Sequence, residues 1–169
     1  MNDAPLIALE RVSESPDETR RHGQRLGALL RGGDVIALSG DLGAGKTTFT
    51  GGIGVGWGAL DPVTSPTFTL VHPHRRAADS LRLYHIDAYR LDSADQVAAL
   101  GWDAIFDGSG AVVVEWAERV LDALPADHVW IELALLDDQR RTITLQAYGT
   151  RARALLEAFD GRKSDAVSD

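Results

Sequence analysis

The segment 40–47, Gly-Asp-Leu-Gly-Ala-Gly-Lys-Thr, is the feature that most constrains how this chain can fold. It matches the phosphate-loop pattern, in which Gly is followed by four residues, Gly-Lys, and Ser or Thr. Residues 34–39 before it predict a short buried strand, and the residues from Thr47 onward predict a helix. This strand–loop–helix order is the context that the pattern requires. We therefore expect an α/β fold arranged around a phosphate-binding site.

The residue types in this loop suit an anionic ligand. Glycine tolerates positive φ, so consecutive backbone N–H groups can converge on one phosphate, and the following helix adds its positive N-terminal end. Lys46 is expected to reach the β- and γ-phosphates, and the Thr47 hydroxyl to coordinate magnesium. The chain has fifteen arginines but only two lysines, so the lysine at 46 departs from a strong bias. A compact ammonium fits a crowded phosphate better than a planar guanidinium.

Composition limits the other classes of function. A chain of 169 residues is expected to form one domain, 1–160, followed by a polar and disordered tail, 161–169. The net charge of −8, with no dense cluster of basic residues, argues against independent nucleic-acid binding. The chain has no cysteine, no apolar run of about 18 residues and no secretory signal, which predicts a cytoplasmic protein without a membrane span.

Periodicity predicts alternating helices and strands along the rest of the chain. Strands are expected at 6–12, 81–87, 111–115, 129–135 and 142–148, the last two forming an antiparallel hairpin at a sheet edge. Helices are expected at 16–30, 94–100, 102–106 and 150–159, with a short helix or turn at 118–124. Ser15 and Glu18 form a capping box at the first helix. Five glycines in 51–58 predict that the helix after the phosphate loop is short or frays early.

Two predicted strands end on a carboxylate. The strand 81–87 ends at Asp87, and the β-branched run 111–115 ends at Glu115, in the manner of a Walker B element with Glu in place of Asp. Ligands of open α/β sheets lie beyond the carboxyl ends of the strands, so both acids can converge on the magnesium of the phosphate loop. A strand that ends in an acid is also common by chance, and from pattern alone both interpretations stay open.

Other polar residues have a functional and an ordinary interpretation. The hydroxyl-rich stretch with Thr64, Ser65 and Thr67 is a candidate loop that senses the γ-phosphate, or a surface turn. Thr19 is a candidate contact for the nucleotide base, or an ordinary residue of the first helical turn. His72, His74 and His85 are interpreted as solvated loop histidines rather than a metal site. Most tryptophans are expected to pack in the core, whereas Trp116, directly after Glu115, is a candidate wall of the site.

Four blocks together resemble the TsaE (YjeE) family. They are G-D-L-G-A-G-K-T-T at 40–48, T-S-P-T-F-T-L-V at 64–71, Y-H-I-D-A-Y-R-L at 84–91 and V-V-E-W at 113–116. Their order and spacing agree with that family of small bacterial ATPases, which is required for threonylcarbamoyladenosine modification of tRNA. The resemblance extends from about residue 13 to residue 148.

The resemblance implies a fold, a nucleotide and residue roles. It implies a P-loop NTPase-like α/β sheet, mainly parallel with an antiparallel extension, with helices on both faces, that binds ATP and Mg²⁺. It implies phosphate contacts from Gly43, Ala44, Gly45, Lys46, Thr47 and Thr48, magnesium ligands from Thr47 and Glu115, and a γ-phosphate-sensing loop with Thr64, Ser65 and Thr67. Asp87 would act near the attacking water or the metal, and Trp116 would line the site. The implied partners are TsaD and TsaB, with tRNA reached through that complex.

Two other functions stay open from the sequence. The same loop would serve a small-molecule kinase, although no convincing arginine-bearing lid follows the strand that ends at Glu115, where Arg140 and Arg141 could be mistaken for one. It would also serve a nucleotide-gated binding module with negligible turnover, because few catalytic groups beyond the metal ligands are evident.

Overall fold

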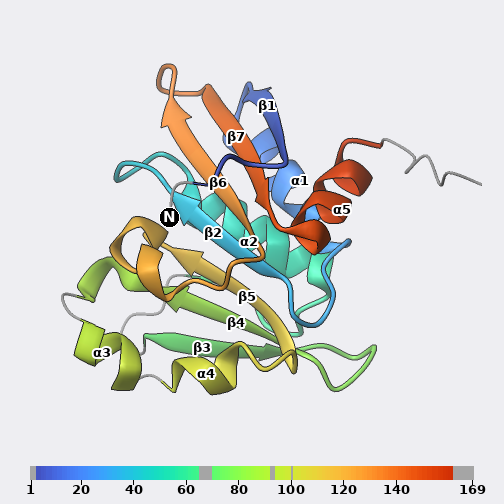
Figure 1. Cartoon of the computed structure of the whole chain (residues 1–169). Helices are drawn as coiled ribbons and strands as arrows, with labels where there is room; N and C mark the ends of the chain where they lie inside the picture. The colour runs from blue at the N-terminus through green and yellow to red at the C-terminus, as the bar shows by residue number, and fades with distance from the viewer. Residues whose placement is uncertain (1–2, 65–69, 92–93, 100, 162–169) are drawn as a thin grey trace, which may run out of the picture.

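A seven-stranded mixed sheet forms the centre of the molecule (Figure 1). The computed structural model describes residues 3–64, 70–91, 94–99 and 101–161. The strands follow the order β1-β7-β6-β2-β5-β4-β3 across the sheet. Their bounds are Ile7–Ser13 (β1), Val35–Ser39 (β2), Val71–Arg75 (β3), Arg82–Asp87 (β4), Gly110–Glu115 (β5), His128–Leu135 (β6) and Arg141–Tyr148 (β7). The four central strands, β6, β2, β5 and β4, are parallel to one another.

The outer strands run antiparallel and correct one detail of the prediction. β6 and β7 form the expected antiparallel hairpin, but β1 pairs with the far side of β7. The edge on that side is therefore β1 and not the hairpin. The alternation of residues in β7 shows which face is buried, but it does not show how many strands pair with it.

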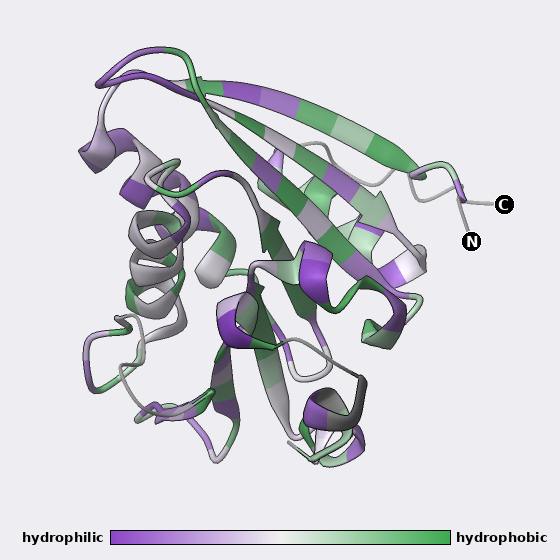
Figure 2. Cartoon of the chain, turned by 90° about the vertical axis from the view of Figure 1, so that its left-hand side faces the viewer, coloured by the Kyte–Doolittle hydropathy of each residue, from purple (hydrophilic) through white to green (hydrophobic). Residues whose placement is uncertain are grey.

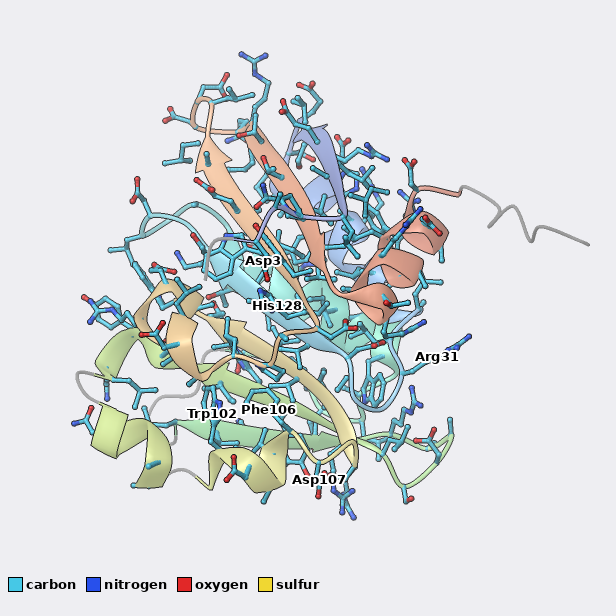
Figure 3. All side chains as sticks on the ribbon, in the orientation of Figure 1. Asp3, Arg31, Trp102, Phe106, Asp107 and His128 are labelled. Atoms are coloured by element: carbon cyan, nitrogen blue, oxygen red, sulfur yellow. The ribbon has the colours of Figure 1, made fainter. Side chains whose placement is uncertain are left out.

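Helices cover both faces of the sheet, as the fold prediction requires. One face carries α1 (Pro16–Gly27), α2 (Lys46–Trp57) and α5 (Thr150–Phe159). The other carries α4 (Trp102–Ile105) and the 3-10 helices η1 (Ala88–Arg90), η2 (Ala117–Arg119) and η3 (Leu121–Ala123), and α3 (Ala94–Ala99) contacts α4. Trp102 and Phe106 pack edge to face on this second side (Figure 3). Each face therefore has its own apolar cluster.

Burial differs between the centre and the outer part of the sheet. All six residues of β5 are buried, which explains its uninterrupted apolar sequence. The long outer strands alternate hydrophobic and hydrophilic residues, a contrast that is visible in Figure 2. Among the described residues, no helix combines the length and the apolar composition that crossing a membrane requires.

The helix after the phosphate loop differs from its prediction. α2 runs without a break for 12 residues to Trp57, and the Gly58 that caps it adopts the left-handed conformation. Two of its glycines face α1: a Cβ added at Gly52 or Gly56 would collide with backbone carbonyls of α1, and one added at Gly23 or Gly27 of α1 would collide with α2. The prediction of a short or fraying helix was wrong because tertiary packing between two glycine-lined faces outweighs low helix propensity.

The Ser15 N-cap of α1 is confirmed, whereas the Glu18 side chain bonds one residue earlier than the capping box predicts. The Ser15 hydroxyl accepts a hydrogen bond from the Glu18 N–H at 3.1 Å, and Pro16 occupies the first turn. The Glu18 carboxylate accepts from the backbone N–H of Glu14 at 3.0 Å. These two hydrogen bonds fix the N-terminal end of α1, which follows β1 in the chain.

Candidate nucleotide site

The phosphate loop connects β2 to α2 through three glycines with positive φ. Gly40, Gly43 and Gly45 have φ values of 144°, 81° and 105°. These conformations are disfavoured for residues with a Cβ, which explains the glycine spacing that the sequence shows. The loop leaves the carboxyl end of β2 and enters α2 at Lys46, so it lies at the end of the sheet toward which β2, β4 and β5 all point (Figure 1).

Lys46 is folded against the loop. The residue is 5% exposed, and its Nζ donates hydrogen bonds to the carbonyl oxygens of Gly40 and, at 2.9 Å, Asp41. The ammonium also lies 3.9 Å from the centroid of the Trp116 ring, a cation–π contact. Burial lowers the pKa of Lys46, while the nearby carboxylates of Glu118 and Glu115 act in the opposite direction.

Glu115 joins the loop to the central strand β5. It is 2% exposed, and its Oε1 accepts a hydrogen bond from the Thr47 hydroxyl at 3.0 Å. Glu115 lies opposite Leu38 of β2 on one side and Asp87 of β4 on the other. Strand register therefore brings both predicted carboxylates to the mouth of the phosphate loop.

Asp87 ends β4 and begins the 3-10 helix η1. Its Oδ1 accepts a hydrogen bond from the Tyr89 N–H at 3.0 Å, so one oxygen helps to cap this short helix. Asp87 is half-buried and borders the same cavity as Lys46 and Thr47. This placement suits a base, a group that orients water or a contact to a metal, and does not choose among them.

One cavity of about 320 Å³ lies between the loop and the strand ends. Its lining residues are Leu42, Gly43, Gly45, Lys46, Thr47, Thr48, Asp87, Tyr89, Glu115 and Trp116. Eight of these ten were candidate site residues from the sequence; Leu42 and Tyr89 were not. The volume lies at the lower end of the range for small-ligand sites.

Trp116 and Tyr89 form an aromatic wall of this cavity. Their ring centroids are 4.9 Å apart. Trp116 has φ 58° and ψ 40°, and within the described part of the chain no other residue besides glycine has positive φ. A bulky residue in this conformation is strained, and such strain tends to be kept at functional sites.

The remaining candidate residues either do not line the cavity or lie outside the described residues. Ala44 is buried, and its N–H donates to the Asp41 carbonyl at 3.0 Å. Thr19 is buried, and its hydroxyl shares a 2.7 Å hydrogen bond with that of Ser13. Thr64 is exposed and does not line the cavity, and Ser65 and Thr67 lie outside the described residues. Their contacts with a nucleotide stay predictions.

Arg141 is a contact to the loop that sequence reasoning missed. It begins β7, and its guanidinium donates to the carbonyl oxygens of Ala44 at 3.1 Å and Gly43 at 3.3 Å. The same group donates to the Asp137 carbonyl in the β6–β7 turn at 2.9 Å. Arg141 therefore braces the phosphate loop against the β6–β7 hairpin. Because Arg141 and the loop are far apart in the sequence, no local pattern predicts this contact.

The prediction of solvated loop histidines was wrong for His74 and His85, whereas His72 is exposed as predicted but lies in a strand. His72 and His74 lie in β3 and His85 lies in β4, so none is in a loop, and His74 and His85 are 4% and 0% exposed. Pro73 is tolerated because β3 is the last strand of the sheet, where a missing N–H breaks no ladder. His85 contacts the site directly, since its Nε2 is hydrogen-bonded to Oε2 of Glu115.

Comparisons with known proteins identify a family and close structural likeness. Residues 13–143 match the family described as threonylcarbamoyl adenosine biosynthesis protein TsaE. The tRNA threonylcarbamoyladenosine biosynthesis protein TsaE of Bacillus subtilis is 41% identical over 143 residues, which cover 85% of this chain and 88% of the relative. The protein of the same name from Treponema pallidum is 42% identical over 134 residues, covering 79% and 97%. The crystal structure of Bacillus subtilis YdiB has a TM-score of 0.75 and 35% identity, covering 92% of this chain and 95% of that one.

Proposed function

This chain belongs to the TsaE family, whose members take part in tRNA threonylcarbamoyladenosine biosynthesis, and from that premise we propose that it is the ATP-hydrolysing subunit of the modification. In this proposal it binds ATP with Mg²⁺ and acts with the partners TsaD and TsaB, which transfer the threonylcarbamoyl group to adenosine. Contact with tRNA is indirect, because a net charge of −8 opposes binding to a polyanion.

The observation that carries this proposal is the convergence of one ammonium, one hydroxyl and two carboxylates on one cavity. Lys46 and Thr47 come from the loop, Asp87 from β4 and Glu115 from β5. A phosphate loop without acids at the neighbouring strand ends would bind an anion, but it would lack the groups that position a metal and a water. The combination therefore favours nucleotide hydrolysis over simple phosphate binding.

The residues present fit a magnesium ion. The Thr47 hydroxyl and the Glu115 carboxylate lie in hydrogen-bond contact at the cavity wall, and both are hard oxygen ligands. Magnesium is commonly held by one or two such groups together with water and substrate phosphates. When bound, the ion would supply positive charge beside the phosphate oxygens.

The chain's own groups would act mainly by position and charge. Lys46, released from the carbonyls of Gly40 and Asp41, would place its ammonium on the phosphates, and the loop N–H groups would hold their oxygens. Asp87, which borders the cavity, would orient the attacking water. Trp116 and Tyr89 would cover one side and limit the access of other water.

Hydrolysis measured alone and with partners tests the proposal. We would follow magnesium-dependent release of phosphate from ATP by the chain, first alone and then with TsaB, TsaD and tRNA. We expect a low rate alone and stimulation by the partners that supports repeated modification of tRNA. Lys46→Ala should abolish tight ATP binding and turnover, whereas Lys163→Ala, which removes the other lysine of the chain, should leave both unchanged.

Each other outcome points to a different function. Modification that needs bound ATP but no hydrolysis would make the chain a nucleotide-gated switch. Transfer of phosphate to a small metabolite would make it a kinase. Wild-type ATP affinity in Lys46→Ala would refute the site itself.

A further inference from the structure

A buried hydrogen bond behind the site links His85 to Glu115. His85 is 0% exposed, and its Nε2 is bonded to Oε2 of Glu115. The other oxygen of that carboxylate, Oε1, accepts from the Thr47 hydroxyl. Both oxygens of Glu115 thus have a defined partner, one from β4 and one from the phosphate loop.

The chemistry of the pair fixes the direction of this hydrogen bond. In the ionised form in which Glu115 would bind a metal, its carboxylate only accepts, so Nε2 of His85 would carry the hydrogen and donate it. Nδ1 of the same ring is buried and has no hydrogen-bond partner among the described residues. Buried polar atoms are normally satisfied, so a leucine or phenylalanine would suit the packing of this position better. Packing alone therefore does not account for a histidine at position 85.

The backbone gives this contact little freedom. His85 pairs in register with Val113 of β5, two residues before Glu115, and the two strands are parallel. Side chains two residues apart on a strand share a face, so His85 and Glu115 project from adjacent strands to the same side of the sheet. A donor on a central strand holds its acceptor more firmly than one on a loop.

We infer that His85 is a positioning residue for Glu115. Its N–H holds Oε2, and so keeps Oε1 turned toward Thr47, where the hydroxyl and the carboxylate together would receive the magnesium of bound ATP. The inference rests on the proposed function. Carboxylates that bind metals are commonly fixed by such outer partners, whose removal costs about 10–100-fold in metal affinity or activity.

This role predicts a specific defect. Loss of the N–H should weaken the part of nucleotide binding that depends on magnesium, because only that part uses the orientation of Glu115. Binding of the nucleotide without metal uses Lys46 and the loop N–H groups, and should not change. A general packing defect would instead lower both affinities together.

Calorimetric titration with a non-hydrolysable ATP analogue, in excess Mg²⁺ and in EDTA, separates these effects. His85→Phe keeps a flat ring without a donor, and His85→Leu is a smaller donor-free alternative should the first variant not fold. His85→Gln keeps an amide N–H. His74→Phe is the matched control, since His74 is a buried histidine of the adjacent strand that has no hydrogen bond to Glu115.

We expect His85→Phe to lose about 10–100-fold of the affinity that magnesium adds, with the affinity in EDTA unchanged. His85→Gln should retain more of the magnesium effect than His85→Phe, and His74→Phe should retain all of it. A wild-type magnesium effect in His85→Phe, or an equal loss in Mg²⁺ and EDTA, would overturn the positioning role. If the wild-type chain itself bound no nucleotide, the proposed function would fail, which is a distinguishable result.

Discussion

The glycine-lined contact between α1 and α2 makes the same substitution act in opposite directions at adjacent residues. Alanine at Gly51 should stabilise the fold, and alanine at Gly52 should destabilise it. Both residues lie inside α2, so the change in helix propensity is the same for both. What differs is the space that the new methyl group would occupy.

The structure gives the size of each effect. Alanine is favoured over glycine in a helix interior by about 0.5–1 kcal/mol. At Gly51 the nearest atom to an added Cβ is the Val63 carbonyl oxygen at 3.5 Å, an ordinary contact, so the gain is retained. At Gly52 the added Cβ would overlap the Arg20 carbonyl oxygen and lie 3.1 Å from the Gln24 nitrogen. These are backbone atoms of a packed helix, and overpacking of this kind costs about 1–3 kcal/mol.

Subtracting the gain in propensity leaves Gly52→Ala less stable than the wild type by up to about 2.5 kcal/mol. For a chain of this length, 1 kcal/mol corresponds to a change in Tm of about 2–4 °C. Urea unfolding followed by circular dichroism would measure both variants, with equal m-values as the check that unfolding stays two-state. Because α2 begins at Lys46, Gly52→Ala should also weaken ATP binding. A Gly52→Ala variant as stable as Gly51→Ala would refute the close-packed contact.

Two further predictions concern the loop brace and the buried histidines. Arg141→Ala should weaken ATP binding about five- to tenfold, because two phosphate-loop carbonyls lose charged donors worth about 1 kcal/mol net. Calorimetry should find Arg140→Ala unchanged, since its guanidinium bonds an exposed turn; equal losses would contradict the brace. Burial lowers the pKa of both His22 and His74 below 6.5. As the pH falls below that value the unfolded chain binds more protons than the folded one, so the free energy of unfolding should decrease. Urea titrations from about pH 7 to 5 should show a shallower decrease in the free energy of unfolding for the double variant His22→Gln, His74→Gln than for the wild type. A decrease parallel to that of the wild type would exclude these histidines as the cause.

Features set by neighbouring residues were predictable from the sequence. The glycine spacing of the phosphate loop, the Ser15 cap and the buried run that ends in Glu115 each reflect interactions within a few residues. The meeting of the phosphate loop with Asp87 and Glu115 was also predictable, since parallel strands that carry the loop and the acids bring their carboxyl ends to the same edge of the sheet. The outer position of β1 was not predictable, because alternation in β7 is the same with one neighbour or two.

Features set by distant partners were missed or predicted wrongly. Arg141 donates a hydrogen bond to Ala44 of the loop, which lies 97 residues earlier in the chain, and nothing near Arg141 in the sequence indicates that contact. His85 was interpreted as solvated because Pro73 restricts the local geometry and no suitably spaced carboxylate completes a metal site, yet the Glu115 carboxylate, 30 residues away, is hydrogen-bonded to its buried Nε2. In both cases the polar side chain bonds a partner that is distant in the sequence and that only the fold brings near.

The wrong predictions for α2 and for His85 share a physical cause that bears on the site. Low helix propensity in α2 and a polar histidine in β4 each look locally unfavourable, and each is compensated by a contact that fixes a site residue. The glycines allow α2, and with it Lys46 and Thr47, to lie directly against α1. The histidine holds the carboxylate that Thr47 contacts. The helix glycines and the buried histidine are each unfavourable in their own segment. In this chain such residues therefore mark the contacts that fix the phosphate loop and Glu115 relative to each other.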